Sequence, residues 1–206
     1  RTISVHPHCF HGRFRFSIAE KIQYCFASDL GHSTKIPVVP GPEQLLAYDM
    51  WFKKHVQRIT SNPIDSAIVR MLTSGFSKLL ESREVEEQLY TSSSTFEPHC
   101  IFWIKVKELV GELHSFLHHA HACFVSDTLM IAAALRPHIK KLRFISGLGS
   151  LSHCVWFHQP IFDVNEWMLY ETKSASRAYI TGKLWSRDGT LLLSSSQEAL
   201  VRLKSM

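Results

Sequence analysis

The sequence predicts an α+β fold in which one long helix is followed by a run of antiparallel strands. Three observations lead to this prediction: an apolar strand pattern runs over 100–106, a helical pattern follows over 108–135, and four further strand patterns occupy the chain up to residue 203. A helix followed by consecutive strands is typical of an antiparallel sheet with the helix on one face.

Individual elements of this pattern have recognisable ends. The long helix is expected to stop before Pro137, because the residue preceding a proline is biased away from helical backbone angles. Short strands are expected over 154–158 and 167–172. The last two strands, over 177–185 and 191–203, are predicted to form a hairpin, because Arg187-Asp188-Gly189 supplies a turn between them.

The segment before residue 88 is expected to hold fewer elements. Two short strands are predicted over 1–6 and about 13–18, and two strands do not form a stable domain by themselves. After a proline-rich loop, two helices are expected, one from Pro42 to about Val56 and one from about Asn62 to Leu80.

Composition fits a globular protein of one or two domains. The chain has 206 residues, of which 45% are hydrophobic and 20% are charged. Its net charge of +5 suits an anionic substrate, but no run or stripe of Lys and Arg indicates nucleic acid. The longest weakly charged stretch, 120–135, is too short to span a membrane. We therefore expect neither a nucleic-acid partner nor a membrane span.

The cysteines are typical of free thiols in a reducing compartment. There are five of them, an odd number, and no two have the CxxC spacing. Four histidines crowd one stretch, and His114 and His118 could share a metal on one helix face. No HExxH spacing occurs, so a surface or packing role is preferred for them and no metal site is assigned.

The final strand pattern places a polar side chain on the face expected to be buried. Side chains of a strand alternate between its two faces. From Leu191 to Leu203 the odd positions are mainly apolar, and Gln197 falls among them. A buried amide without partners costs about 1–3 kcal/mol, so we expect a hydrogen-bond partner, either in a structural contact of the core or in a functional site.

The helical pattern contains a similar exception. Asp127 is the only formally charged residue between Ala120 and Leu135, and its helical neighbours three and four positions away are apolar. A carboxylate in such surroundings must be paired, hydrogen-bonded or protonated. A structural contact explains it as well as a site shared with Gln197, and the sequence alone does not show that the two side chains meet.

Several motifs in order resemble those of TesB-type acyl-CoA thioesterases, the acyl-CoA thioesterase II family. The resemblance is strongest from Asp127 onward. It rests on Ile36–Glu43, Ser126–Asp127, Ala134–His138, Ser150–His158, Glu166–Glu171, Gly182–Trp185, Arg187–Gly189 and Gln197–Glu198.

The resemblance implies a double-hotdog architecture, in which a long helix packs on an antiparallel sheet in each half. Residues 88–206 are then a complete C-terminal hotdog domain, 27–87 a connector with two helices, and 1–26 a remnant hairpin of an N-terminal hotdog. The chain is accordingly expected to be N-terminally truncated. Such a chain is a fragment, or it dimerises to replace the missing half, or it has lost activity. A homo-oligomer is expected.

The resemblance also implies hydrolysis of fatty acyl-CoA to a free fatty acid and CoA, a reaction of lipid and fatty-acid metabolism. The family places an Asp on the helix, a Ser or Thr on the next strand and a Gln on the last strand, which correspond to Asp127, Ser150 and Gln197. Asp127 is expected to accept a proton from water while the other two side chains orient that water. No covalent intermediate, metal or redox cofactor is implied.

Three further residues, Trp156, Phe157 and His153, are expected to contact the acyl-CoA substrate, with core packing as the alternative for the aromatic side chains. A peroxisomal location follows from the resemblance. Lys204-Ser205-Met206 does not match the Ser-Lys-Leu signal, so a cytoplasmic location is the alternative.

Two alternatives to hydrolysis through an activated water remain open from the sequence. A truncated homologue could be an inactive module that binds acyl-CoA or a protein partner. Alternatively, Ser150 could be a covalent nucleophile paired with His153, but the GxSxG turn that presents such a serine is absent, since Leu148 and Ser152 occupy the glycine positions.

Overall fold

The computed structural model describes residues 2–3, 14–15, 34–48, 50, 78–86, 97–111, 115–138 and 144–203. It divides the chain into two units, residues 1–33 and 34–206. In the first unit, β1 (Thr2–Ile3) pairs antiparallel with β2 (Phe14–Arg15). The rest of the strands predicted there, and most of the two connector helices, lie outside the described residues.

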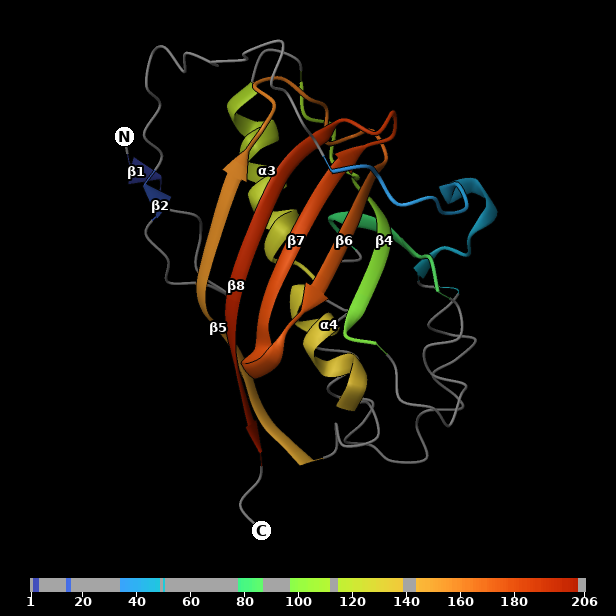
Figure 1. Cartoon of the computed structure of the whole chain (residues 1–206). Helices are drawn as coiled ribbons and strands as arrows, with labels where there is room; N and C mark the ends of the chain where they lie inside the picture. The colour runs from blue at the N-terminus through green and yellow to red at the C-terminus, as the bar shows by residue number, and fades with distance from the viewer. Residues whose placement is uncertain are drawn as a thin grey trace. The chain divides into compact units, whose positions relative to one another are not determined.

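The second unit contains a six-stranded antiparallel sheet with the order β3-β4-β6-β7-β8-β5 (Figure 1). Its strands are β3 (Leu80–Glu84), β4 (His99–Val106), β5 (Ile145–Phe157), β6 (Met168–Ser174), β7 (Tyr179–Ser186) and β8 (Leu191–Leu203). The predicted strands over 100–106 and 167–172 and the final hairpin are confirmed. β5 is much longer than the predicted strand over 154–158.

Strand β3 was not predicted. Apolar residues at helical spacing placed Leu80 on a helix and the acidic residues after it in a connector ending at residue 87. Instead, Leu80 pairs with Val106 and Glu84 pairs with Phe102, so β3 forms an edge of the sheet. Pairing with β4 is a long-range interaction, and a short apolar pattern does not by itself distinguish a strand from a helix.

The helical pattern over 108–135 is split in two. α3 spans Ser115–Asp127 and α4 spans Met130–Leu135, so the predicted stop before Pro137 is confirmed. Between them, Thr128 Oγ1 donates to Phe124 O at 2.7 Å and Leu129 adopts a φ of 63°, an uncommon left-handed conformation that interrupts the helix. No helix in the described part of the chain is long and apolar enough to cross a membrane.

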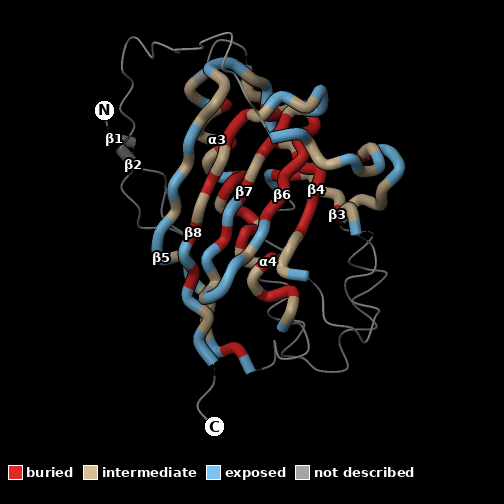
Figure 2. Tube along the Cα trace, viewed as in Figure 1, coloured by how far each residue is buried: buried red, intermediate tan, exposed pale blue. Residues whose placement is uncertain are grey.

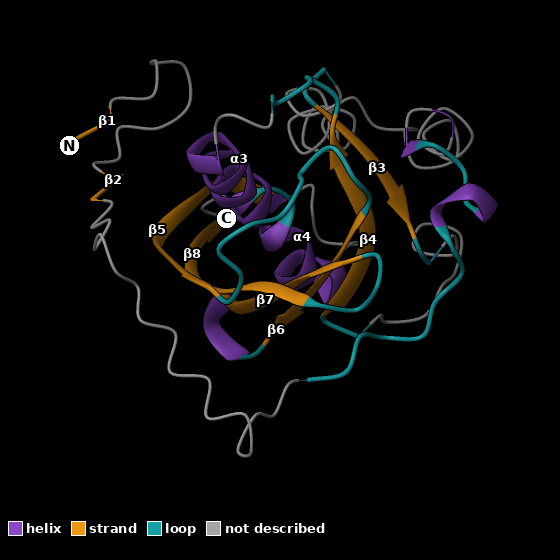
Figure 3. Ribbon diagram, turned by 90° about the horizontal axis from the view of Figure 1, so that it is seen from above, coloured by secondary structure: helices purple, strands orange, loops and turns teal. Residues whose placement is uncertain are grey.

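The sheet curls around α3 and α4, which pack against its inner face (Figure 3). Buried side chains from both layers form one core, as the red segments of Figure 2 show. Its members include Phe102, Ile104, Ala122, Val125, Met130, Ala133, Met168, Tyr170, Ile180, Leu184 and Leu193. The predicted α+β fold, a helical layer on an antiparallel sheet, is confirmed.

The outer face of the sheet is partly covered by residues 34–45. Ile36, Val39 and Leu45 from this segment pack on the buried cluster Ile101, Trp103, Trp167 and Leu169. Trp103 Nε1 donates to Pro40 O at 2.8 Å. The segment contains the short 3-10 helix η1 (Pro42–Gln44), where the start of a longer helix was expected.

Gly182 on β7 tests how tightly the inner face is packed. A Cβ at this position would lie 2.6 Å from Tyr170 Oη and also too close to Ser195 Oγ. We predict that Gly182→Ala lowers the free energy of unfolding by about 1–3 kcal/mol, the usual cost of overpacking a core. The urea unfolding midpoint measures this effect.

Gly149→Ala is the matched control, since a Cβ on that strand glycine meets no atom within 4 Å. It should leave stability unchanged or slightly raised, because alanine restricts the unfolded chain more than glycine does. Equal midpoints for both variants would contradict the tight packing at Gly182.

Candidate active site

Gln197 lies on the inner face of β8, as its position in the alternating pattern predicted. Leu193, Ser195, Gln197 and Ala199 are all buried, whereas Glu198, Leu200 and Arg202 are exposed. Only 2% of the Gln197 surface is accessible. The amide therefore needs partners inside the domain.

A bulge in β5 brings two of the predicted site residues to the same side of the sheet. Ser150 pairs with Ala199 and His153 pairs with Gln197, with a register shift between Ser150 and Ser152. In a regular strand, residues three apart point to opposite faces. The extra residue at the bulge corrects this alternation, so Ser150 and His153 both point inward while Leu151 is 67% exposed.

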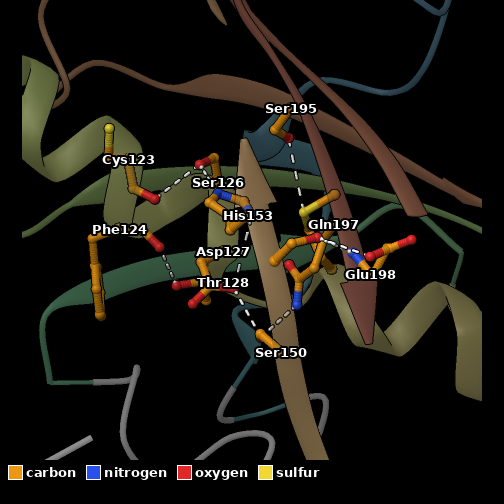
Figure 4. A network of polar contacts seen from close by, with 12 residues as sticks. Cys123, Phe124, Ser126, Asp127, Thr128, Ser150, His153, Ser195, Gln197 and Glu198 are labelled. Atoms are coloured by element: carbon orange, nitrogen blue, oxygen red, sulfur yellow. Dashed lines mark hydrogen bonds and ion pairs between the residues drawn. The ribbon is translucent and has the colours of Figure 1, made fainter. Parts of the chain in front are cut away.

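Asp127 is the last residue of α3 and faces β5 (Figure 4). Its side chain is 24% exposed, so it is half-buried rather than enclosed by the apolar neighbours that the sequence suggested. Ser150 Oγ donates to Asp127 Oδ1 at 3.3 Å, and Gln197 Nε2 donates to Ser150 Oγ at 2.6 Å. The structure therefore joins all three predicted catalytic side chains in one directed chain of hydrogen bonds.

His153 makes a second connection between β5 and the end of α3. Its Nε2 lies 2.8 Å from Ser126 Oγ, and its Nδ1 lies 3.9 Å from Asp127 Oδ1. Burial lowers the pKa of the imidazole, and this effect is only partly opposed by the Asp127 carboxylate and by a hydrogen bond with Gln197. The surroundings of His153 therefore disfavour the protonated imidazole, although Asp127 lies close to it.

Ser126 was not predicted as a separate site residue, although it stands next to Asp127. It is completely buried, and its hydroxyl donates to Cys123 O at 2.8 Å. Tyr170 Oη from β6 donates to the Ser126 carbonyl. Ser126 therefore connects the end of α3 to the sheet twice, through its hydroxyl to His153 on β5 and through its carbonyl to Tyr170 on β6.

The two aromatic residues predicted to bind substrate lie on opposite faces of β5. Phe157 points to the inner face, with its ring centroid 4.7 Å from that of His119. Trp156 is 54% exposed and, as the next residue along a strand, points to the outer face. Trp156 is therefore directed away from Asp127, Ser150 and Gln197, and its contact with the substrate stays a prediction.

The histidine-rich stretch forms no metal site among the residues that the structure describes. His118 Nδ1 accepts the Val164 N–H at 3.2 Å, His121 Nδ1 donates to Leu117 O at 2.7 Å, and His119 packs on Phe157. His114 is outside the described residues. The alternative of a covalent Ser150 nucleophile gains no support, because His153 hydrogen-bonds to Ser126 and Ser150 donates to Asp127.

The cysteine on α3 close to Asp127, Cys123, is poorly suited to act as a nucleophile. Cys100, Cys123 and Cys154 are free thiols, as expected for the cysteines in this part of the chain. Burial raises the pKa of the Cys123 thiol to about 11, so the reactive thiolate is scarce near neutral pH.

A helix held inside a curled antiparallel sheet defines a hotdog-fold domain, and in this one carboxylate, hydroxyl and amide side chains meet at the end of the helix. The family model for acyl-CoA thioesterase matches residues 80–200, more than half of the chain. The chain therefore belongs to the acyl-CoA thioesterase family, and the resemblance to TesB-type enzymes is confirmed.

Individual relatives agree with this assignment. Acyl-coenzyme A thioesterase 8 of Mus musculus is 30% identical over 204 residues, covering 94% of this chain and 61% of that protein. Acyl-CoA thioesterase 2 of Haemophilus influenzae is 36% identical over 84 residues, covering 38% of this chain and 29% of that protein. The chain thus spans about three fifths of the length of the mouse relative.

The fold is also similar to that of a solved structure. The crystal structure of acyl-CoA thioesterase II TesB2 from Mycobacterium marinum superimposes with a TM-score of 0.62 at 20% sequence identity. The similarity covers 85% of this chain and 59% of that one, and it supports the hotdog fold.

The lowered pKa of His153 leads to a prediction about stability. The unfolded chain binds a proton near the ordinary histidine pKa of about 6.5, whereas the folded chain resists that proton. The free energy of unfolding should therefore fall as the pH drops from about 6.5 through the folded pKa of His153.

His153→Asn removes this titration and should make the decline shallower between about pH 7 and pH 5, as measured by urea unfolding at a series of pH values. Some decline should remain, because burial also lowers the pKa of His158. Superimposable pH curves for the variant and the unaltered chain would contradict a lowered pKa at His153.

Proposed function

We propose that this chain hydrolyses a fatty acyl-CoA thioester to a free fatty acid and CoA. The observation that carries the proposal is the hydrogen-bond chain from Gln197 through Ser150 to Asp127. These residues come from β8, β5 and α3, which are distant in the sequence, and they meet at one half-buried carboxylate. Membership of the acyl-CoA thioesterase family supports the thioester as the bond that is broken.

The polar groups suit the activation of a water molecule. Gln197 donates to Ser150 and Ser150 donates to Asp127, so the Ser150 hydrogen is directed at the carboxylate and one lone pair remains on Asp127 Oδ1 for a further donor. A water that donates to Asp127 gains nucleophilicity at its oxygen. That oxygen attacks the thioester carbonyl carbon, the C–S bond breaks, and a carboxylic acid and a thiol are formed.

The acyl chain requires an apolar surface next to this water. Phe157 and Phe162 lie on the same side of the sheet as the polar chain, with ring centroids 6.2 Å apart, and His119 from α3 packs on both. We propose that this aromatic group and His153 contact the substrate. The homo-oligomer and the peroxisomal location expected from the sequence stay predictions.

Thiol release from a long-chain acyl-CoA tests the proposal. Asp127→Asn keeps the shape of the side chain but removes its charge, and it should lower kcat by about 10²–10⁴-fold. Ser150→Ala and Gln197→Leu should each lower kcat by a smaller factor, because they position the water and the carboxylate without carrying charge.

The matched control is Glu198→Gln, which removes a carboxylate at the position next to Gln197. Glu198 is exposed on the outer face, where it contacts Ser152, and its loss should leave turnover unchanged. Saturable binding of acyl-CoA by folded protein without thiol release would overturn the hydrolase proposal and favour the acyl-CoA-binding module.

A further inference from the structure

A row of half-buried side chains leads along α3 away from the polar site. Asp127, Cys123 and His119 follow one another at intervals of four residues, so they lie on the same side of the helix. Each of them is half-buried. This side of the helix is therefore neither part of the sealed core nor fully open to solvent.

A second row runs beside it on β5, the strand next to α3 (Figures 1 and 3). His153, Val155 and Phe157 alternate onto the inner face of this strand and are also half-buried. The two rows meet at both ends. Asp127 lies near His153 at one end, and His119 contacts Phe157 at the other.

The end of the rows farthest from the polar site is filled by the aromatic group of His119, Phe157 and Phe162. The His119 ring centroid lies 4.7 Å from that of Phe157 and 4.9 Å from that of Phe162. The two phenyl rings are stacked, with centroids 6.2 Å apart. Rings from the helix, the strand and the loop after β5 thus bridge the two layers at this point.

The loop that carries Phe162 is fixed in place. The Val164 N–H donates to His118 Nδ1 on α3 at 3.2 Å, and the Val164 carbonyl accepts the Val106 N–H at 2.9 Å. Asn165 Nδ2 also donates to Val106 O at 2.9 Å. Phe162 is therefore held by a loop that is anchored to both the helical layer and the sheet.

Smaller side chains occupy the middle of both rows. Cys123 stands halfway between His119 and Asp127, and Val155 stands halfway between His153 and Phe157. A thiol and an isopropyl group extend less far than an aromatic ring. The rows therefore leave more room in the middle than at the aromatic group, which closes their far end.

The distance from the polar site to the aromatic group is similar along both rows. His119 and Asp127 are eight positions apart on α3, which corresponds to about 12 Å at the rise of a helix. His153 and Phe157 are four positions apart on β5, which corresponds to about 13 Å at the rise of a strand. An extended hydrocarbon advances about 1.25 Å per bond, since C–C bonds of about 1.5 Å meet at tetrahedral angles, so about 10 carbons span this distance.

The opposite direction along β5 suits the CoA part of the substrate better. There the strand carries Gly147 and Gly149, and a Cβ at Gly149 would meet no atom within 4 Å. Bare backbone allows the close approach of a ligand, and the arm of CoA contains amide groups that need hydrogen-bond partners. The hydrocarbon chain is accordingly expected to follow the two rows toward the aromatic group.

We propose that the aromatic group of His119, Phe157 and Phe162 is a length stop for the acyl chain, which makes medium-chain acyl-CoA the preferred substrate. The inference rests on the proposed thioester hydrolysis and names its substrate class. An acyl chain of about 10 carbons fills the rows from the polar site to the rings. A longer chain has to bend or displace the rings, and overfilling a packed site is unfavourable.

Thiol release from straight-chain acyl-CoAs of increasing length tests the stop. For the unaltered chain, kcat/KM should rise by up to about fourfold per added methylene until about 10 carbons, because each methylene that leaves water contributes to binding. Beyond that length it should fall, to on the order of 10-fold below its maximum at about 16 carbons.

Phe162→Ala removes one ring of the stop without touching the polar site. The maximum should move to longer chains, and the ratio of kcat/KM at about 16 carbons to that at about 10 carbons should rise on the order of 10-fold. A variant that had only lost stability would lose activity toward all chain lengths together, so this ratio separates the two effects.

Val155→Phe places a ring in the middle of the strand row instead. It should move the maximum to chains shorter than about 10 carbons, because the usable length of the rows is reduced. Opposite shifts in the two variants are not produced by a general loss of stability.

Ile161→Ala is the matched control. Ile161 is the neighbour of Phe162 in the same loop, but its side chain is 81% exposed. Its removal should leave the dependence of kcat/KM on chain length unchanged.

The outcomes distinguish this inference from the proposed function. If the unaltered chain hydrolyses acyl-CoA but kcat/KM rises steadily to about 16 carbons, the length stop is overturned while hydrolysis stands. The same holds if Phe162→Ala or Val155→Phe keeps the unaltered profile. If the folded, unaltered chain releases no thiol at any chain length, both the hydrolase and the length stop fail.

Discussion

The pairing of β5 with β8 determines the position of nearly every side chain in the candidate site. Register between these strands places His153 opposite Gln197 and Ser150 opposite Ala199. The bulge at Leu151 then turns Ser150 and His153 to the same face, although they are three residues apart. Without the extra residue, one of them would point to the outer face and the hydrogen-bond chain to Asp127 would be broken.

The helical layer depends on the same sheet. Asp127 reaches Ser150 because α3 ends directly over β5. Several contacts hold that end of the helix in place. Tyr170 holds the Ser126 carbonyl, His153 holds the Ser126 hydroxyl, and the left-handed Leu129 separates α4 from α3. Polar side chains at a buried helix end thus serve two purposes, since they satisfy backbone and hydroxyl groups and also place the Asp127 carboxylate beside the His153 imidazole.

Local sequence patterns predicted most of the sheet but not its edges. The alternating pattern of β8 and the turn at Arg187–Gly189 identified the hairpin, because both signals lie within a few residues of one another. β3 was missed because Leu80 fits the helical spacing of the residues before it, and the polar residues after it show no apolar alternation that would indicate a strand. The long helical pattern did not reveal the break after Asp127, because apolar spacing continues through Thr128 and Leu129 while the backbone does not.

For the site, the sequence by itself determined that Asp127 and Gln197 are polar residues among apolar neighbours and that the chain resembles the acyl-CoA thioesterases. Those conclusions need only side-chain identity and spacing along one element. The tertiary structure alone decided that the two residues meet through Ser150, that Trp156 faces the other side, and that His153 contacts Ser126 at the end of α3. Each of these depends on strand register, on a bulge or on a hydrogen bond between Ser126 and His153, which are 27 positions apart in the sequence. No local pattern encodes such contacts.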